Sequence, residues 1–268
     1  MQIPLATPAT ALAPHEVAVL VIHGFTATQA SIHDLAQAIA KQGYVVHTPL
    51  LPGHGTVPAD LAATTWSMWA AAIHVAVDAA QAQPGIRAVA LVGQSLGGLL
   101  ALHTAANRHD IAAVVSLAAP VWLDGLARAA ARVTGPAVIH RHLTWLPKLG
   151  GADIADRTRA ADVQGYPRIP TAALAQLNEF MAVVKAELPH LRAPVCVMHS
   201  LRDHTAPVAC ASFIASATRA KRLRLLRESF HLLAVDVERD IVAKESLDFL
   251  NAWVCRAGAP ARTNDAKQ

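Results

Sequence analysis

Cysteine is scarce in this sequence, and none of the three, Cys196, Cys210 and Cys255, forms a C-x-x-C pair with another. Three cysteines cannot all pair with one another, so we expect reduced, mostly buried thiols and a reducing compartment. The first sixteen residues contain no Lys or Arg and no long hydrophobic run, which disfavours a secretory signal. The expected location is therefore the cytoplasm.

Charged side chains are also few, at 16% of the chain, and the basic excess behind the formal net charge of +4 is spread along the sequence. The one dense basic cluster consists of Arg219, Lys221, Arg222, Arg224 and Arg227. We interpret it as the solvated face of a strand and its approach loop. A nucleic-acid surface would need a larger basic patch, so no nucleic-acid partner is expected.

Long hydrophobic runs that could cross a membrane are likewise missing. Residues 88–106 carry no charge over a helix-spanning length. However, three glycines, Gln94, Ser95 and His103 interrupt this stretch, so it reads as a buried strand followed by a packed helix. With 53% hydrophobic residues in 268, the chain can fill a sizeable globular core, and no stable membrane insertion is expected.

What the sequence does contain is a regular alternation of strand-like and helix-like segments. Short β-rich apolar runs occur at 17–22, 44–50, 86–92, 111–119, 193–200 and 222–226, with amphipathic or Ala-rich segments between most of them. Repetition of this kind predicts an α/β fold with a mostly parallel sheet covered by helices on both faces. The carboxyl ends of the strands then share one edge, where such sheets bind ligands.

Residues 120–189 interrupt the alternation, because this interval is too long for an ordinary connection and has helical patterning of its own. We interpret it as a small helical cap inserted over the edge of the sheet. The predicted organisation is therefore a core made of residues 1–119 and 190–268 with an inserted cap at 120–189.

The strongest motif is the run from Gly93 to Gly97, which fits the G-x-S-x-G nucleophile elbow and lies between a predicted strand and a predicted helix. Glycines are needed on either side because a Cβ there would collide with the tight strand and helix. The elbow presents the hydroxyl of Ser95 at the sheet edge as a candidate nucleophile.

A serine hydroxyl needs a base, and the base needs an orienting carboxylate. In such elbows the chain order is Ser, then Asp or Glu, then His. His231 is the one histidine in the loop after the last predicted strand, and we assign it as general base. Asp203, just past the strand at 193–200, is the candidate acid, with Asp124, Asp236 and Asp240 as competitors. We interpret His204 as a loop residue.

A tetrahedral intermediate also needs hydrogen-bond donors for its anionic oxygen. One candidate is the backbone N–H of Leu96, at the start of the helix after Ser95. The other is the N–H of Phe25 in the loop after the first strand, where Gly24 lets the backbone come close. The alternative is that His23, Gly24 and Phe25 form only a strand-ending turn.

These motifs occur together and in order, as HGFTAT, LLPGHGT, GQSLGG, SLRDHTAPV and SFHLLAVD, and with them the chain resembles the α/β-hydrolase superfamily. More narrowly it is similar to the bacterial carboxylesterase and monoacylglycerol lipase group, over about residues 17–253. This resemblance implies an α/β-hydrolase fold, hydrolysis of carboxylic esters, no metal or organic cofactor, and a triad of Ser95, Asp203 and His231. Relatives that act on halides or epoxides carry Asp at the elbow, so Ser95 disfavours those reactions here.

The cap should supply apolar walls to a substrate pocket, although helix spacing equally fits packing of the cap on the core. The candidate wall residues are Trp122, Leu123, Leu126, Phe180, Met181 and Val184. His140 and His142 lack further ligands, so we expect no metal.

The predicted substrate is a small molecule, a short- to medium-chain acyl ester or a monoacylglycerol. The alternatives are a thioester or C–C bond hydrolase that uses the same triad, and a ligand-sensing protein of this fold. We expect a monomer or a homodimer.

Overall fold

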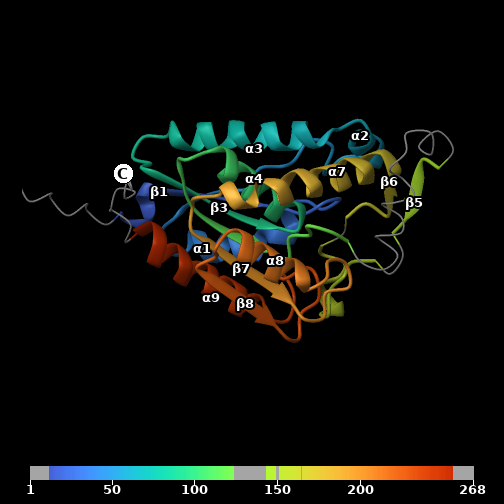
Figure 1. Ribbon diagram of the computed structural model, residues 1–268. Helices are drawn as coiled ribbons and strands as arrows, with labels where there is room; N and C mark the ends of the chain where they lie inside the picture. Colours follow the sequence, from blue (N-terminus) through green and yellow to red (C-terminus); the bar gives the residue numbers. More distant parts are fainter. Residues whose placement is uncertain (1–11, 124–142, 149–150, 164, 256–268) are drawn as a thin grey trace, which may run out of the picture.

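A wholly parallel six-stranded sheet runs through the molecule in the order β2-β1-β3-β4-β7-β8 (Figure 1). The structure, a computed structural model, describes residues 12–123, 143–148, 151–163 and 165–255. The strands of this sheet are β1 (Val17–Ile22), β2 (Val45–His47), β3 (Ala88–Gln94), β4 (Ile111–Leu117), β7 (Val195–Ser200) and β8 (Arg222–Leu226). The predicted mostly parallel sheet is confirmed.

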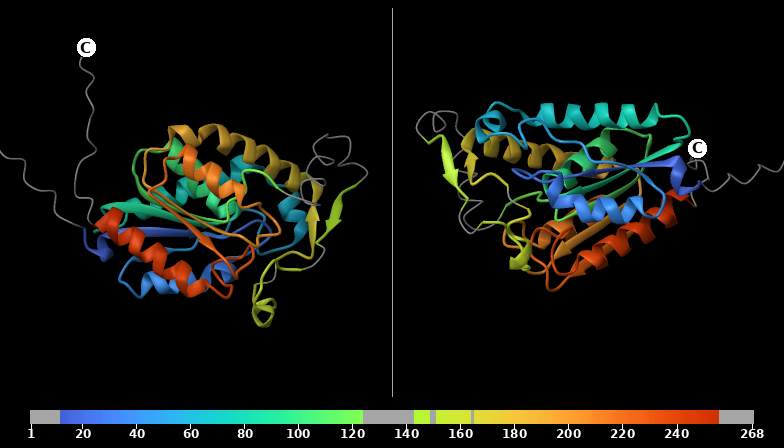
Figure 2. Two further views of the ribbon diagram at one scale, coloured as in Figure 1. Left: turned by 60° about the horizontal axis from the view of Figure 1, so that its bottom comes forward. Right: turned by 180° about the vertical axis from the view of Figure 1, so that it is seen from behind.

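Helices cover both faces of this sheet, as the sequence predicts (Figures 1 and 2). One face carries α1 (His33–Ala40) and α9 (Arg239–Leu250), and the other carries α3 (Trp66–Gln81), α4 (Leu96–Asn107) and α8 (Ala209–Ala217). The short helix α2 (Pro58–Ala62) precedes α3, and α9 continues into a wide π-helical turn at Asn251–Cys255. Single-turn 3-10 helices occur at Pro14–Glu16, Gln29–Ile32, Arg157–Arg159 and Leu188–His190.

Strand β1 shows why the sheet needs helices on both sides. All six of its residues are buried, and they alternate between the two hydrophobic clusters of the molecule. Ala18, Leu20 and Ile22 face the cluster with α3 and α4, while Val17, Val19 and Val21 face the cluster with α1 and α9. An unbroken apolar strand is typical of a parallel sheet that is covered twice.

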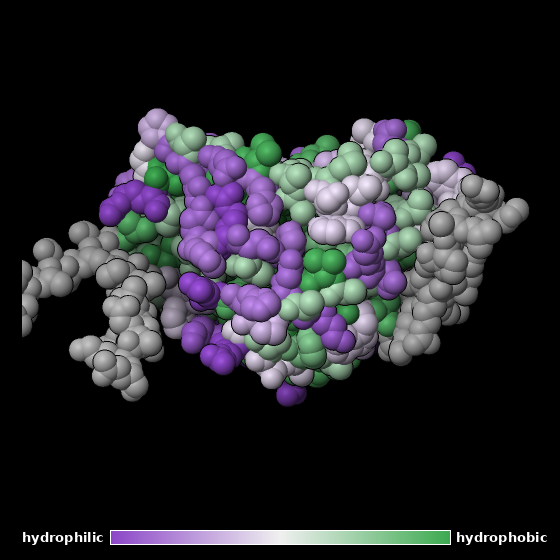
Figure 3. Space-filling model, turned by 45° about the horizontal axis from the view of Figure 1, so that its top comes forward, coloured by the Kyte–Doolittle hydropathy of each residue, from purple (hydrophilic) through white to green (hydrophobic). Residues whose placement is uncertain are grey.

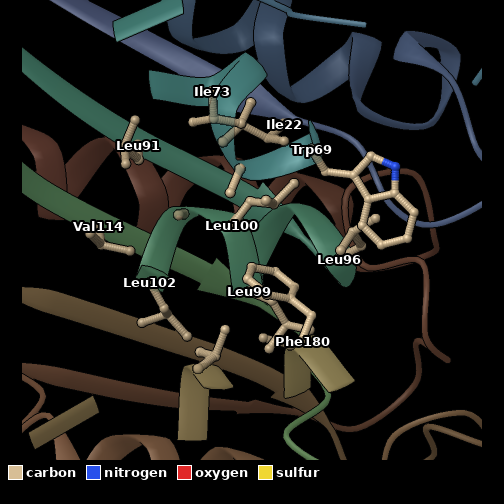
Figure 4. Close-up of a cluster of buried hydrophobic side chains, with 14 of the residues drawn as sticks. Ile22, Trp69, Ile73, Leu91, Leu96, Leu99, Leu100, Leu102, Val114 and Phe180 are labelled. Carbon is tan, nitrogen blue, oxygen red and sulfur yellow. The ribbon is translucent and has the colours of Figure 1, made fainter. Parts of the chain in front are cut away.

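Helix α4 is the centre of the larger cluster. Its first ten residues are all buried, and Figure 4 shows Leu96, Leu99 and Leu100 among side chains from the neighbouring elements. Trp69 of α3 and Phe180 of helix α7 (Thr171–Glu187) are both fully buried beside it. Burial on all sides holds the helix that follows Ser95 in a fixed position.

The region between β4 and β7 contains a short antiparallel hairpin of β5 (Trp145–Pro147) and β6 (Arg168–Pro170), followed by α7. The two views of Figure 2 place the hairpin beyond the carboxyl ends of the parallel strands. The sequence predicts only helices here, so the hairpin is new, whereas the helix predicted from TAALAQLNEFMAVVKAEL is present as α7. The cap boundaries at 120–189 stay a prediction.

Figure 3 shows that hydrophilic residues gather at the end of its face nearer the chain termini, and that apolar and weakly polar residues are commoner toward the other end. Val57, directly before α2, and Met68, in the first turn of α3, are 54% and 45% exposed. No helix within the described ranges is long and apolar enough to span a bilayer.

Candidate active site

Ser95 lies at the junction of β3 and α4 in a conformation that L-amino acids rarely adopt, with φ 57° and ψ −116°. The neighbouring glycines make this turn possible. A Cβ added to Gly93 would stand 2.0 Å from the carbonyl oxygen of Gly97, and one added to Gly97 would stand 2.1 Å from the carbonyl oxygen of Ile22. Both distances are far below van der Waals contact, so β1, β3 and α4 can meet here only without side chains.

His231 follows β8 and points its Nε2 at the hydroxyl of Ser95, with 2.9 Å between Nε2 and Oγ. Its other ring nitrogen, Nδ1, lies 2.8 Å from Oδ2 of Asp203. Burial lowers the pKa of His231, but the charge of Asp203 and its hydrogen bond outweigh this effect, so that the pKa is raised above 6.5. The ring is therefore oriented to take a proton from Ser95 at Nε2 while Nδ1–H donates to the carboxylate.

Asp203 is held by the backbone of its own loop. Its Oδ1 accepts hydrogen bonds from the N–H groups of Thr205 and Ala206, at 2.8 and 2.7 Å. Burial raises the pKa of this carboxyl, but the charge of His231 and hydrogen bonds from His199 and His231 lower it well below 3.8. His199, in β7, places Nε2 3.3 Å from Asp203 Oδ2 and 2.9 Å from the carbonyl oxygen of Ala206.

Of the other candidate acids, neither Asp236 nor Asp240 pairs with the Nδ1 of His231, which bonds Asp203. Asp240 is exposed in the first turn of α9. Asp236 is fully buried and instead accepts hydrogen bonds from the backbone N–H groups of Ala155, Asp156, Phe230 and Val237, at 2.7–3.1 Å. Asp124 lies outside the described residues.

The loop after β1 brings Gly24 directly beside Ser95. A Cβ added to Gly24 would stand 3.3 Å from Ser95 Cβ and 3.9 Å from Ser95 Oγ. The backbone N–H of Phe25 makes no hydrogen bond with any residue in the described ranges. Leu96 is the first residue of α4, where an N–H has no acceptor inside the helix. Two donors thus remain available on the two sides of Ser95.

The conformation of this loop depends on a neutral histidine. The Nδ1 of His23 donates to the carbonyl oxygen of Gly24 at 2.9 Å, and its Nε2 accepts from the N–H of Leu51 at 3.2 Å. Complete burial is the main reason that its pKa falls to about 4. The ring of His54 stands 5.1 Å away, edge to face. Both ring nitrogens of His23 are therefore hydrogen-bonded, as the alternative of a strand-ending turn requires. The same bonds also fix Gly24 next to Ser95.

Gln94, which sequence reasoning did not single out, joins the elbow to the histidine loop. Its amide nitrogen donates to the carbonyl oxygen of His231 at 2.8 Å, and its amide oxygen accepts from the N–H of Ala234 at 3.3 Å. The side chain is 1% exposed, so these two bonds replace solvent completely. The only sequence signal was its position directly before the serine.

Residues between β5 and β6 bind to the loops that carry His231 and Thr26. The carbonyl oxygen of Asp153 accepts from the N–H groups of His231 and Leu232, both at 3.2 Å. The carboxylate of Asp153 pairs with Nδ1 of His204 at 2.8 Å, so His204 is a loop residue that fastens this contact. Tyr166 donates its N–H to the carbonyl oxygen of Thr26 at 3.0 Å, next to Phe25.

Similarity to a known protein family covers most of this chain. Residues 13–238 match the family described as serine aminopeptidase, S33. The chain belongs to the serine aminopeptidase S33 family. The resemblance to α/β-hydrolases is thereby confirmed, since this S33 match covers the elbow, the loop after β1 and both other triad positions.

Two relatives of this S33 protein are named as ester hydrolases. It is 33% identical over 237 residues to the thermostable monoacylglycerol lipase of Bacillus sp. (strain H-257), which covers 87% of this chain and 90% of the lipase. It is 25% identical over 235 residues to the carboxylesterase of Bacillus subtilis (strain 168), covering 87% and 92%. A solved structure reported for the metagenome-derived lipolytic enzymes LipS and LipT superposes with a TM-score of 0.80 at 28% identity, covering 91% of this chain and 98% of that one.

Only some of the predicted pocket residues lie in the part of the chain that the structure describes. Trp122 is partly buried, edge to face with Phe213 at 5.6 Å between ring centroids. Met181 is 3% exposed inside the main hydrophobic cluster, where packing already accounts for it. Leu126, His140 and His142 lie outside the described residues. Substrate contact by Trp122, Leu126 and Met181 stays a prediction.

Proposed function

We propose that this protein is a serine hydrolase that cleaves carboxylic esters of short to medium acyl chains, or monoacylglycerols. The observation that supports this most directly is the continuous chain of contacts from Ser95 Oγ to His231 Nε2 and from His231 Nδ1 to Asp203 Oδ2, at 2.9 and 2.8 Å. The names of the two Bacillus relatives, a monoacylglycerol lipase and a carboxylesterase, support the same substrate class.

In the proposed reaction Ser95 Oγ attacks the ester carbonyl carbon while His231 Nε2 takes the hydroxyl proton. The negative charge moves to the carbonyl oxygen, which accepts hydrogen bonds from the N–H groups of Phe25 and Leu96. Asp203 stabilises the imidazolium and keeps the proton of Nδ1 in place. His231 then gives its Nε2 proton to the leaving alkoxide, and the alcohol departs from an acyl-serine.

Water completes the cycle by the same steps. His231 takes a proton from the water as its oxygen attacks the acyl carbonyl, and returns a proton to Ser95 Oγ when the acid leaves. The loop that carries His231 is fixed on both sides, by Gln94 and by Asp153, so the base keeps its position through both halves of the reaction.

The cytoplasmic location and the monomeric or homodimeric state stay predictions.

The test is hydrolysis of p-nitrophenyl esters of increasing acyl length by the wild type and by Ser95→Ala, with intact-mass analysis after treatment with a fluorophosphonate. Turnover that is lost in Ser95→Ala, together with one adduct on Ser95, is the expected result. An adduct without ester turnover would contradict the proposal and favour a thioester or C–C bond substrate, or ligand sensing. No adduct would mean that Ser95 is not a working nucleophile.

A further inference from the structure

Lys148 is unusual among the cationic side chains of the described residues. Five Lys and Arg residues there are half-buried, and four of them pair with a carboxylate within 3.6 Å. These four are Arg108, Arg159, Arg222 and Arg239. Lys148 has no carboxylate partner in the described ranges; its Nζ makes one long hydrogen bond, 3.4 Å to the Oγ1 of Thr26.

The ammonium group of Lys148 lies at the rim of the catalytic loops. Thr26 directly follows Phe25, and a Cβ added to Gly165 would stand 3.0 Å from Thr26 Oγ1 and 3.2 Å from Lys148 Nζ. The backbone of Lys148 is fixed as well, because its N–H donates to the carbonyl oxygen of Pro167 at 3.1 Å and so extends the β5–β6 hairpin. The charge of Lys148 also acts on His231, where it opposes part of the rise in pKa that Asp203 causes.

Among the described residues, the carboxylate whose charge acts on Lys148 is that of Asp153, and it is already hydrogen-bonded elsewhere. Asp153 raises the pKa of Lys148 by its charge, but its carboxylate accepts hydrogen bonds from His204 Nδ1 at 2.8 Å, His204 N–H at 3.1 Å and Thr205 Oγ1 at 3.0 Å. Partial burial outweighs Asp153 and lowers the pKa of Lys148 below 10.5. A half-buried cation left without an anion costs free energy, which an anionic ligand would recover.

We propose that Lys148 binds an acidic group of the substrate, so that the enzyme selects esters carrying a carboxylate a few bonds from the ester group. This inference rests on the proposed ester hydrolysis and specifies its substrate class. Lys148 contributes by binding rather than by chemistry: the ammonium lies beside the loop of Phe25 and would hold the carboxylate while the ester carbonyl reaches Ser95. The carboxylate could belong to the acyl part or to the alcohol part of the ester.

The experiment compares matched substrate pairs of equal chain length. For the acyl side, monomethyl succinate, glutarate and adipate are compared with methyl butyrate, valerate and hexanoate. For the alcohol side, O-butyryl glycolate is compared with ethyl butyrate. The measured quantity is the ratio of kcat/KM for the anionic ester to that for its neutral partner, in the wild type, Lys148→Met and Lys148→Gln.

In the wild type the ratio should exceed one for at least one pair. Lys148→Met and Lys148→Gln should both lower that ratio by about 10- to 100-fold, which is the effect expected from losing one hydrogen bond between charged groups. The pair affected shows which side of the ester carries the acid. Lys221→Met is the matched control, because Lys221 is exposed beside Trp253 and directly precedes β8, at the amino-terminal end of an edge strand. It should leave every ratio within about twofold of the wild type.

A purely structural lysine would give a different result. If Lys148 only supports the loop of Thr26, substitution lowers kcat/KM for anionic and neutral esters alike and leaves their ratio unchanged, which would overturn the proposal. Neutral esters preferred in every pair by the wild type would overturn it too. Failure of Ser95-dependent hydrolysis for all of these esters would instead contradict the proposed function itself.

Discussion

The carbonyl oxygen of Asp153 accepts a hydrogen bond from the backbone N–H of His231 at 3.2 Å. This contact joins the region between β5 and β6 to the proposed general base, although the two residues lie far apart in the sequence. The position of His231 therefore depends on three separate parts of the chain, namely Asp203 on β7's loop, Gln94 before the nucleophile, and Asp153.

Asp203→Asn should lower kcat by about 10⁴-fold, because an amide no longer holds the Nδ1–H tautomer of His231 or stabilises its protonated form. Acyl-ester kinetics measure the loss, and thermal unfolding shows whether the variant remains folded. Asp240→Asn is the matched control, since Asp240 is an exposed aspartate in the first turn of α9. If Asp124→Asn abolished activity while Asp203→Asn did not, the assignment of the acid would be wrong.

The pH dependence follows from the raised pKa of His231. The base must be neutral to accept the serine proton, so kcat/KM should rise with pH and reach half of its maximum above pH 6.5, the ordinary pKa of histidine. Activity is lost as pH falls through this raised pKa. A pH profile from 5 to 9 with a substrate whose chemistry is rate-limiting gives the measurement. A flat profile across this range would argue against His231 as the base.

Gly97→Ala should destabilise the fold by about 3 kcal/mol or more, since its Cβ would stand 2.1 Å from the carbonyl oxygen of Ile22 and backbone would have to move. Chemical denaturation measures the free energy of unfolding. Gly85→Ala is the control: nothing lies within 4 Å of its added Cβ, and only its φ of +87° opposes the change, at about 1 kcal/mol. Equal losses in the two variants would contradict the steric account.

Asp236→Asn should lower the free energy of unfolding by about 3 kcal/mol, because a fully buried carboxylate there accepts N–H groups from two separate loops. Activity should fall as well, because Asp236 holds the backbone N–H of Phe230, the residue before His231, and the loop of His231 would become less fixed. The fall should be smaller than in Asp203→Asn. Denaturation and kcat are measured on the same samples. Unchanged stability combined with a loss as large as that of Asp203→Asn would mean that Asp236 acts in the chemistry.

The features predicted from the sequence are those that depend on local residue patterns. The alternation of apolar runs gave the parallel sheet, and β1 and β8 begin and end where it indicates. The strand predicted at 44–50 is shorter, Val45–His47, because Pro49 has no N–H to give to a ladder. The hairpin of β5 and β6 was missed because its strands are three residues long, each ending in proline.

The elbow could be recognised because Gly93, Ser95 and Gly97 are neighbours in sequence. The choice of acid stayed open because Asp124 follows another predicted strand and because Asp236 and Asp240 lie just after His231, near the last helix. Only the fold shows which carboxylate reaches Nδ1 of His231. The anchoring roles of Gln94 and Asp236 depend on partners up to 140 residues away, so no local pattern could reveal them.

The separation of 136 residues between Ser95 and His231 also matters while the protein is being made. The proposed nucleophile, Ser95, is synthesised well before the proposed base, His231, which follows β8, the last strand of the sheet in chain order. Contacts between residues so far apart form late in folding. A nascent or truncated chain that ends before β8 thus holds the proposed nucleophile without the proposed base, and we expect it to leave esters intact until the final strand has paired.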